Sequence, residues 1–196
     1  MVRMKNINFL GIEPLQNPKF INPIAIHYEQ NGIKKSWESI DNHDSVAILL
    51  YHVEKKAFLL VKQFRPPVYM KNKAHGFTFE LCAGILDKPI DAKLTAKEEI
   101  DEECGYDVPV ESIQRITSFY TSVGFSGTNQ TLYYAQIDES MKKHDGGGVH
   151  GESIELYFLP QEEAKVFAID ETKPKTPGLM FAFYWFFDNY SIKGQA

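Results

Sequence analysis

Five acidic side chains fall within six consecutive residues, Glu98, Glu99, Asp101, Glu102 and Glu103. On a helix, Glu99, Glu102 and Glu103 are related as i, i+3 and i+4, so they share one face. Like charges at this spacing repel by about a few tenths of a kcal/mol per pair. A divalent cation would offset that repulsion, and carboxylate oxygens favour Mg²⁺ or Mn²⁺ over zinc. A solvated acidic face is the alternative that this segment alone leaves open.

The flanking segments determine whether these carboxylates could form a site. Residues 77–81 have the length and composition of a strand, and Cys82-Ala83-Gly84 follows as a small-residue turn. Residues 94–104 are rich in Glu and Ala, which predicts a helix, and Gly105 is a typical helix stop. A strand, a glycine turn and a helix bearing three glutamates would form a compact cradle for a metal.

The remaining elements predict a chain of many strands with one central helix and two late helices. Alternating apolar residues around Asn31-Gly32 predict a hairpin over 24–37. Further strands are expected at 46–51, 58–64, 116–120, 132–137 and 154–159, and helices at 160–167 and from Thr176-Pro177 to about Tyr190.

Length and charge exclude several classes. A chain of 196 residues is long enough for one domain with a short extension. A net charge of −5 argues against a general nucleic-acid binder. The sequence has no apolar run of the roughly 20 residues that span a bilayer, and its N-terminus lacks the pattern of a signal peptide. We therefore expect a cytoplasmic protein that binds neither nucleic acid nor membrane, with Cys82 and Cys104 as buried free thiols.

The segment from Gly84 to Tyr106 resembles the signature of the Nudix hydrolases. The matching residues are Gly84, Glu99, Ile100, Glu102, Glu103, Gly105 and Tyr106. Segments outside this signature resemble the branch of UDP-sugar diphosphatases and ADP-ribose pyrophosphatases, over roughly residues 24–187. They include Ile26-His27-Tyr28, Lys35-Ser36-Trp37, Val61 to Pro66, the triple glycine at 146–148 and Pro174-Lys175-Thr176.

The resemblance implies an α+β Nudix fold, in which a mixed β-sheet is sandwiched between helices, with an N-terminal β-hairpin extension. It divides the chain into an extension over 1–44 that serves dimerisation and a hydrolase domain over 45–196. It implies Mg²⁺-dependent, or Mn²⁺-dependent, cleavage of a UDP-glucose-like substrate or of ADP-ribose at the pyrophosphate. The products are a nucleoside monophosphate and a sugar phosphate, and the active form is a homodimer.

The resemblance also assigns roles to residues. Glu99 and Glu103 are implied as the main metal ligands, with the Ala83 carbonyl as a backbone ligand. Glu102 shares a second metal or its water shell, and Glu152 matches a later acid that is usually a metal ligand. The chemistry requires such ligands because the diphosphate is negatively charged and repels a hydroxide.

Other positions leave alternatives open. Arg65 suits phosphate oxygens but also a surface ion pair, and Glu80 suits either the metals and sugar or a structural role. His150 falls where relatives place a catalytic base, although a metal-activated hydroxide would need none. Tyr28 and Trp37 in the hairpin, which covers the partner's site in relatives, and Phe125 in a Ser/Gly-rich loop suit base stacking, core packing or a dimer contact.

Two positions of the signature depart from the family pattern. Ile90 replaces a glutamate and Glu98 replaces an arginine, and these two residues normally pair. Lys97 projects about 100° away from Glu98 around a helix, so it does not substitute for the arginine. These departures motivate the alternative of a catalytically weak module that binds or senses a nucleotide sugar. The retained Glu99, Glu102, Glu103 and Glu152 argue against it.

Overall fold

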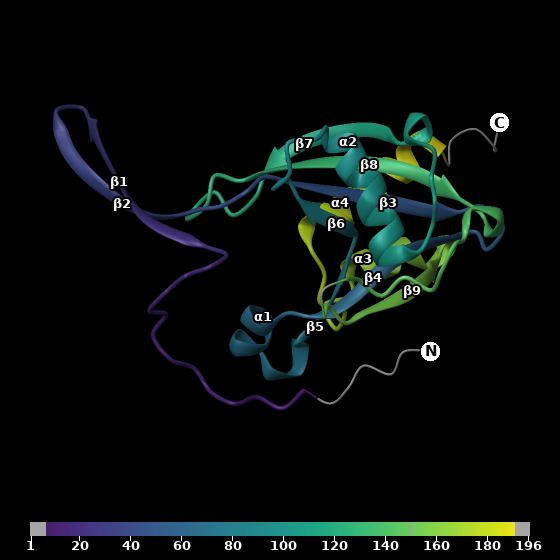
Figure 1. The fold of residues 1–196 in the computed structure, drawn as a ribbon, viewed down its shortest axis with the longest axis horizontal. Coiled ribbons are helices and arrows are strands. Elements are labelled where there is room, and N and C mark those ends of the chain that lie inside the picture. The colour runs from purple at the N-terminus through teal and green to yellow at the C-terminus, as the bar shows by residue number, and fades with distance from the viewer. Residues whose placement is uncertain (1–6, 150, 191–196) are drawn as a thin grey trace.

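A computed structural model of the chain describes residues 7–149 and 151–190. It is a mixed α+β structure with a two-stranded sheet and a separate seven-stranded sheet (Figure 1). The strands are β1 (Asn22–Gln30), β2 (Ile33–Asp41), β3 (Ser45–His52), β4 (Ala57–Phe64), β5 (Phe77–Glu80), β6 (Cys82–Ile85), β7 (Gln114–Tyr120), β8 (Asn129–Ile137) and β9 (Ile154–Pro160). The helices of more than one turn are α1 (Pro66–Lys71), α2 (Ala92–Glu99), α3 (Ala164–Ile169) and α4 (Pro177–Tyr190), with short 3₁₀ turns between them.

The large sheet follows the order β5-β4-β3-β8-β7, with β6 also paired to β3 and β9 also paired to β4. The β3–β8 pair is parallel and the other pairs are antiparallel. Strands β3 and β4 share only three residue pairs next to their connecting turn. Beyond these pairs the two strands take different partners, because β6 pairs with the first half of β3.

The strand β3 is buried on both faces, as expected for a strand between two layers. Val46, Ile48 and Leu50 join one apolar cluster with residues of α2, whereas Ala47 and Leu49 join a second cluster with residues of α3 and α4. The sheet is therefore sandwiched between α2 on one face and α3 and α4 on the other, as the sequence predicted.

The helix predicted over 94–104 begins earlier and changes its winding. Asp91 caps α2 by accepting a hydrogen bond from the backbone N–H of Lys93, and the α-helix ends at Glu99. Residues Ile100–Cys104 continue as a π-helical turn, which ends at Gly105 with φ of 79°. Such turns are rare in proteins as a whole, but many of those that occur lie at functional sites.

Two other expectations are corrected. The small-residue segment after Leu81 is the strand β6 and not a turn, because Val46 and Ala47 pair with Gly84 and Ala83. The helix α1 after Arg65 was not predicted, although it begins with two prolines, which suit a first helical turn.

The N-terminal hairpin stands away from the large sheet (Figure 1). Its turn residues Asn31 and Gly32 have φ of 55° and 76°, as a type I′ turn requires. All of β1 is exposed, including Ile24, Ile26 and Tyr28. A two-stranded hairpin is marginally stable alone, so this extension needs another surface. The division at residue 44 and the dimerisation role stay predictions.

Over the described ranges, no helix is long and apolar enough to cross a membrane. The cytoplasmic location stays a prediction.

Candidate active site

Glu103 anchors the carboxylate cluster to the sheet. It is 5% exposed, and its Oε2 accepts a hydrogen bond of 2.9 Å from the backbone N–H of Ala83 in β6. In a strand, the N–H and C=O of one residue point to the same side. The Ala83 carbonyl therefore faces the same side as Glu103, where it is suited to be a backbone ligand for a cation.

Glu99 lies against Gly84, one residue further along β6. A Cβ placed on Gly84 would overlap the Glu99 carboxylate. The glycine is therefore needed because its missing side chain leaves the space that the carboxylate occupies. The strand β6 thus contacts two of the three glutamates that the sequence singled out.

The two carboxyl groups are protonated more readily than ordinary glutamates. Burial raises the pKa of Glu99 to about 7, and the charges of Glu102 and Glu152 add to the shift. Burial also raises the pKa of Glu103 to about 8, with the Glu99 and Glu152 charges adding to it. The hydrogen bond from Ala83 opposes the shift at Glu103. This is the electrostatic environment that a bound cation would relieve.

The triple-glycine loop brings Glu152 to this cluster. The backbone N–H groups of Gly147 and Gly148 donate to the carbonyls of Glu103 and Glu102 at 2.8 and 3.2 Å. The φ angles at Gly146, Gly147 and Gly148 are 63°, 108° and 82°, and residues that have a side chain rarely adopt such positive values. The loop therefore caps the π-helical turn, and its glycines follow from that close backbone approach.

Glu152 is exposed, and its Oε2 accepts a hydrogen bond of 3.3 Å from the backbone N–H of Val149. A Cβ on Gly148 would lie 2.7 Å from Oε2 of Glu152 and 2.8 Å from its Cβ. The loop geometry thus fixes where Glu152 stands. The charges of Glu102 and Glu152 raise the pKa of Glu99, and those of Glu99 and Glu152 raise the pKa of Glu103, so the four predicted carboxylates form one cluster. His150 lies outside the described residues, so its role as a base stays a prediction.

Arg65 and Glu80 form a two-pronged ion pair. Nε and Nη2 of Arg65 donate to the two carboxylate oxygens of Glu80, each at 2.8 Å. The hydroxyl of Thr78 donates to Glu80 Oε1 at 2.5 Å. Glu80 also raises the pKa of Arg65, and the charges of Glu103 and Glu152 contribute in the same direction. Glu80 therefore orients the guanidinium of Arg65 through two of its nitrogens.

The departures from the family signature have a local explanation. Glu98 pairs with Lys88 in the loop before α2, with 2.7 Å between Nζ and Oε2. In this chain the helix therefore carries the negative charge of the pair and the loop carries the positive charge. Lys97 instead binds Asp107 and the Val108 carbonyl, which agrees with the expectation that it does not replace the arginine. Both ion pairs are exposed and contribute little to stability.

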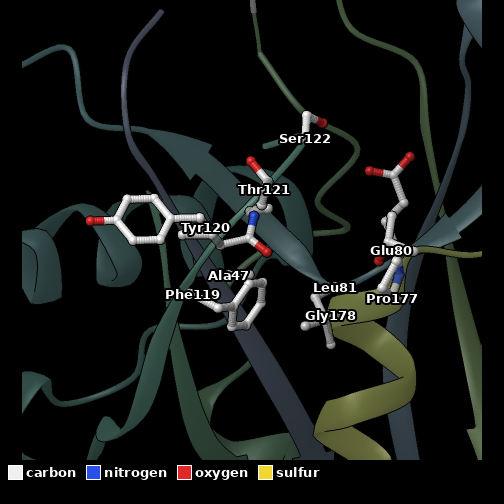
Figure 2. Close-up of a pocket in the computed structure, with 12 residues that line it drawn as sticks. Ala47, Glu80, Leu81, Phe119, Tyr120, Thr121, Ser122, Pro177 and Gly178 are labelled. Atoms are coloured by element: carbon white, nitrogen blue, oxygen red, sulfur yellow. The ribbon is translucent and has the colours of Figure 1, made fainter. Parts of the chain in front are cut away.

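A cavity of about 360 Å³ adjoins the carboxylate cluster, because Ala83, which donates to Glu103, lines it. Figure 2 shows side chains of its lining. Its lining combines the centre of the sheet, the end of β7 and the first turn of α4, including Ala47, Glu80, Ala83, Phe119 and Gly178. The Phe119 ring points toward Leu81 and Gly178, whereas the ring of Tyr120 points away (Figure 2). Sequence reasoning missed this cavity, whose only local signal was the Thr176-Pro177 helix start.

None of the three predicted stacking aromatics lines this cavity. Trp37 lies midway along the hairpin, opposite Ile26, and its indole N–H donates to the Gly124 carbonyl in the loop that holds Phe125, at 2.9 Å. Ile40 N–H and the Ser39 hydroxyl donate to the Phe125 carbonyl at 2.7 and 3.0 Å. Tyr28 lies near the hairpin tip, opposite Lys35. Trp37 therefore holds the 121–128 loop, and a stacking role for these rings within one chain is not supported by the geometry.

A second cluster of candidate metal ligands is already in contact with a lysine side chain. His52, Glu54 and Glu139 place ligand atoms within 4.8 Å of one another at the last residue of β3. The backbone N–H of Lys55 donates to Nδ1 of His52 at 3.3 Å, and the Lys55 ammonium contacts Glu139. Burial lowers the pKa of His52, and its Nε2 lies 3.2 Å from Glu139 Oε1 and 2.9 Å from the Lys55 ammonium.

Known proteins that are similar to this chain are named as pyrophosphatases of nucleotide sugars. The chain is 35% identical to a protein from Bos taurus named uridine diphosphate glucose pyrophosphatase NUDT14, over 94% of this chain and 96% of that protein. The Mus musculus protein of that name is 32% identical over the same shares. A GDP-mannose pyrophosphatase from Pectobacterium atrosepticum is 36% identical over 69% of each chain. No family model matched the chain.

Proposed function

Since this chain belongs to the Nudix family, in the branch of nucleoside-diphosphate-sugar pyrophosphatases, we propose that it hydrolyses a UDP-glucose-like substrate with the help of Mg²⁺. Water attacks one phosphorus of the diphosphate, and the bridging P–O bond breaks. The products are a nucleoside monophosphate and a sugar phosphate. ADP-ribose is a second substrate to be tested, because the resemblance covers that branch too.

The observation that carries the metal proposal is the convergence of carboxylates beside Ala83. Glu99 and Glu103 are mostly buried, with pKa values raised to about 7 and 8. These oxygen donors fit Mg²⁺ or Mn²⁺ rather than a soft metal. Glu99, Glu103 and the Ala83 carbonyl would hold it, with Glu102 and Glu152 completing the set. The cation would neutralise the diphosphate and acidify the attacking water.

The remaining residues act on the substrate directly. Arg65 is held by Glu80 through two hydrogen bonds, which leaves its outer nitrogen to bind a phosphate oxygen. The Gly146–Gly148 loop keeps Glu152 beside the reacting phosphate. If His150 takes part, it accepts a proton from the attacking water.

We also propose that the protein works as a homodimer through its N-terminal hairpin. The apolar side chains Ile24, Ile26 and Tyr28 of β1 are exposed, as are Ile33 and Trp37 of β2. A second copy would bury them, and it would bring the hairpin aromatics to the partner chain.

The deciding experiment is a substrate panel of UDP-glucose, GDP-mannose and ADP-ribose, with and without Mg²⁺ and with products separated by chromatography. We expect UMP and glucose 1-phosphate from UDP-glucose, and no release in EDTA. Binding of every substrate without release of any monophosphate would contradict hydrolysis and favour the sensing alternative.

A further inference from the structure

The cavity beside the carboxylates, called the slot below, combines small residues with one aromatic ring, a lining that suits a flat ring. Part of its lining is made of small residues, because Ala47 of β3 pairs with Ala83 of β6 and Gly178 lies in the first turn of α4. The Phe119 ring forms one wall (Figure 2). The polar side chains of Glu80, Thr121, Ser122, Gln130 and Thr176 also belong to the lining, so it is the flat face of Phe119 that favours a planar ring. A nucleobase buries apolar faces and keeps its polar atoms on its edge.

The position of the cavity suits the nucleoside side of the substrate. Glu80 and Ala83 line it, and the same two residues contact Arg65 and Glu103 at the carboxylate site. A base in the slot is therefore connected through its ribose to a diphosphate at the carboxylates.

Gln130 is the residue of β8 whose polar side chain lines the slot. Gln130 of β8 donates from Nε2 to the Ser45 hydroxyl at 3.2 Å. Its Oε1 lies on the side of Gly178, where it would be 3.2 Å from a Cβ on that glycine. No residue in the described ranges donates a hydrogen bond to this oxygen. The amide thus offers the cavity a carbonyl acceptor, with one N–H beside it.

We propose that this slot binds the nucleobase and that Gln130 selects a base whose ring N–H adjoins a carbonyl, as in uracil and guanine. The ring N–H donates to Oε1 of Gln130, and the free amide N–H donates to the base carbonyl. Cytosine and adenine present the reverse pattern, an unprotonated ring nitrogen beside an amino group. The substrates in the names of the relatives, UDP-glucose and GDP-mannose, contain uracil and guanine, whose ring N–H adjoins a carbonyl. This inference rests on the proposed function.

The test compares UDP-glucose with CDP-glucose, which share the sugar and diphosphate and differ only in the base edge. We expect the wild-type protein to prefer UDP-glucose in kcat/KM by about tenfold or more, because a mismatched base leaves buried polar groups unpaired. Gln130→Leu should bring the ratio close to one. Gln136→Leu is the matched control on the same strand, because Gln136 is exposed and its side chain donates to the Tyr134 hydroxyl, outside the slot. An unchanged ratio in Gln130→Leu would overturn the assignment, as would an effect that follows the hexose and not the base.

A binding measurement separates this inference from the proposed reaction. Uridine and cytidine are titrated into the full chain in EDTA and followed by ligand-observed NMR. We expect Gln130-dependent binding of uridine and little binding of cytidine. That result without hydrolysis of any nucleotide sugar would refute the reaction and keep the slot. Hydrolysis with equal uridine binding by wild type and Gln130→Leu would refute the slot and keep the reaction.

A third variant guards against misfolding. Gly178→Ala places a methyl group 3.2 Å from Gln130 Oε1 and 3.3 Å from the Phe119 ring. Alanine favours a helix more than glycine does, so the melting temperature should be equal to or above that of the wild type. We expect KM for UDP-glucose to rise several-fold. An unchanged KM would contradict the placement of the base in the slot.

Discussion

The backbone N–H of Ala83 donates a 2.9 Å hydrogen bond to the carboxylate of Glu103, twenty residues later in the chain. This contact joins the strand β6 to the π-helical turn and turns the Ala83 carbonyl toward the acids. Removing the charge of Glu103 while keeping an oxygen acceptor tests whether the charge or the contact matters. We expect Glu103→Gln to lower kcat by at least about 100-fold, because metal charge stabilisation is worth several kcal/mol.

The same variant should stay folded, because the amide oxygen still accepts from Ala83. Circular dichroism and thermal melting provide that control. Full activity in Glu103→Gln would remove Glu103 from the metal ligands.

The raised pKa values of Glu99 and Glu103 predict how stability depends on pH. The folded state holds protons up to a pH of about 7 and 8 on these groups, whereas the unfolded chain releases them near their ordinary value of 4.5. The stabilisation from protonation is therefore complete below pH 4.5 and is lost as the pH rises through 7 and 8. Without metal, we expect this contribution to make the melting temperature fall by a few degrees over that window, at roughly 2–4 °C per kcal/mol.

Mg²⁺ should reverse this trend. It binds the ionised carboxylates, so its stabilising effect grows with pH over the same window. Differential scanning fluorimetry with and without Mg²⁺ measures both curves. A Mg²⁺ effect that is equal at pH 5 and pH 8 would argue against Glu99 and Glu103 as ligands, and Glu99→Gln should reduce the slope.

The glycine loop offers a matched pair of variants. Gly148 and Gly151 have φ of 82° and 91°, so alanine strains the backbone similarly at both. A Cβ on Gly148 meets Glu152, whereas a Cβ on Gly151 meets nothing within 4 Å. We expect Gly148→Ala to lower kcat at least about tenfold more than Gly151→Ala, since small displacements of a catalytic group cost large factors. Equal effects of the two variants would contradict the positioning of Glu152 by the loop.

The Arg65–Glu80 pair predicts that the guanidinium geometry matters. Arg65→Lys keeps the charge but loses the two-pronged contact with Glu80. We expect kcat/KM to fall by about tenfold. Arg115→Lys is the control, because Arg115 is exposed and its guanidinium bonds only the Ser118 hydroxyl. An unchanged kcat/KM in Arg65→Lys would leave Arg65 as a surface ion pair, the alternative that its sequence left open.

The exposed hairpin predicts a dimer. Ile26→Asp in β1 places a charge on the apolar side chains that a second copy would cover. We expect the wild type to sediment as a dimer in analytical ultracentrifugation and the variant to shift toward the monomer. His27→Asp, also in β1, is a control on the opposite side of that strand. A monomeric wild type would contradict the proposal.

The sequence by itself determined the elements that depend on local pattern. The hairpin around Asn31-Gly32 and the strands β3, β4, β7, β8 and β9 follow from alternation and turn residues, which act over a few positions. The helix with Glu99, Glu102 and Glu103 follows from composition, and the family follows from the order of these motifs. The caps at Gly105 and Thr176 are local signals too.

Only the tertiary structure decided how distant segments meet. Cys82–Ile85 is a strand because β3 diverges from β4 and leaves an edge for it, and four small residues carry no such signal. Lys88 pairs with Glu98 because a loop folds back on α2. The slot between β7, β8 and α4 arises from residues more than 100 positions apart, Ala47 and Gly178 among them. Pairing edges and cavities depend on long-range packing, which the periodicity of a single segment does not encode.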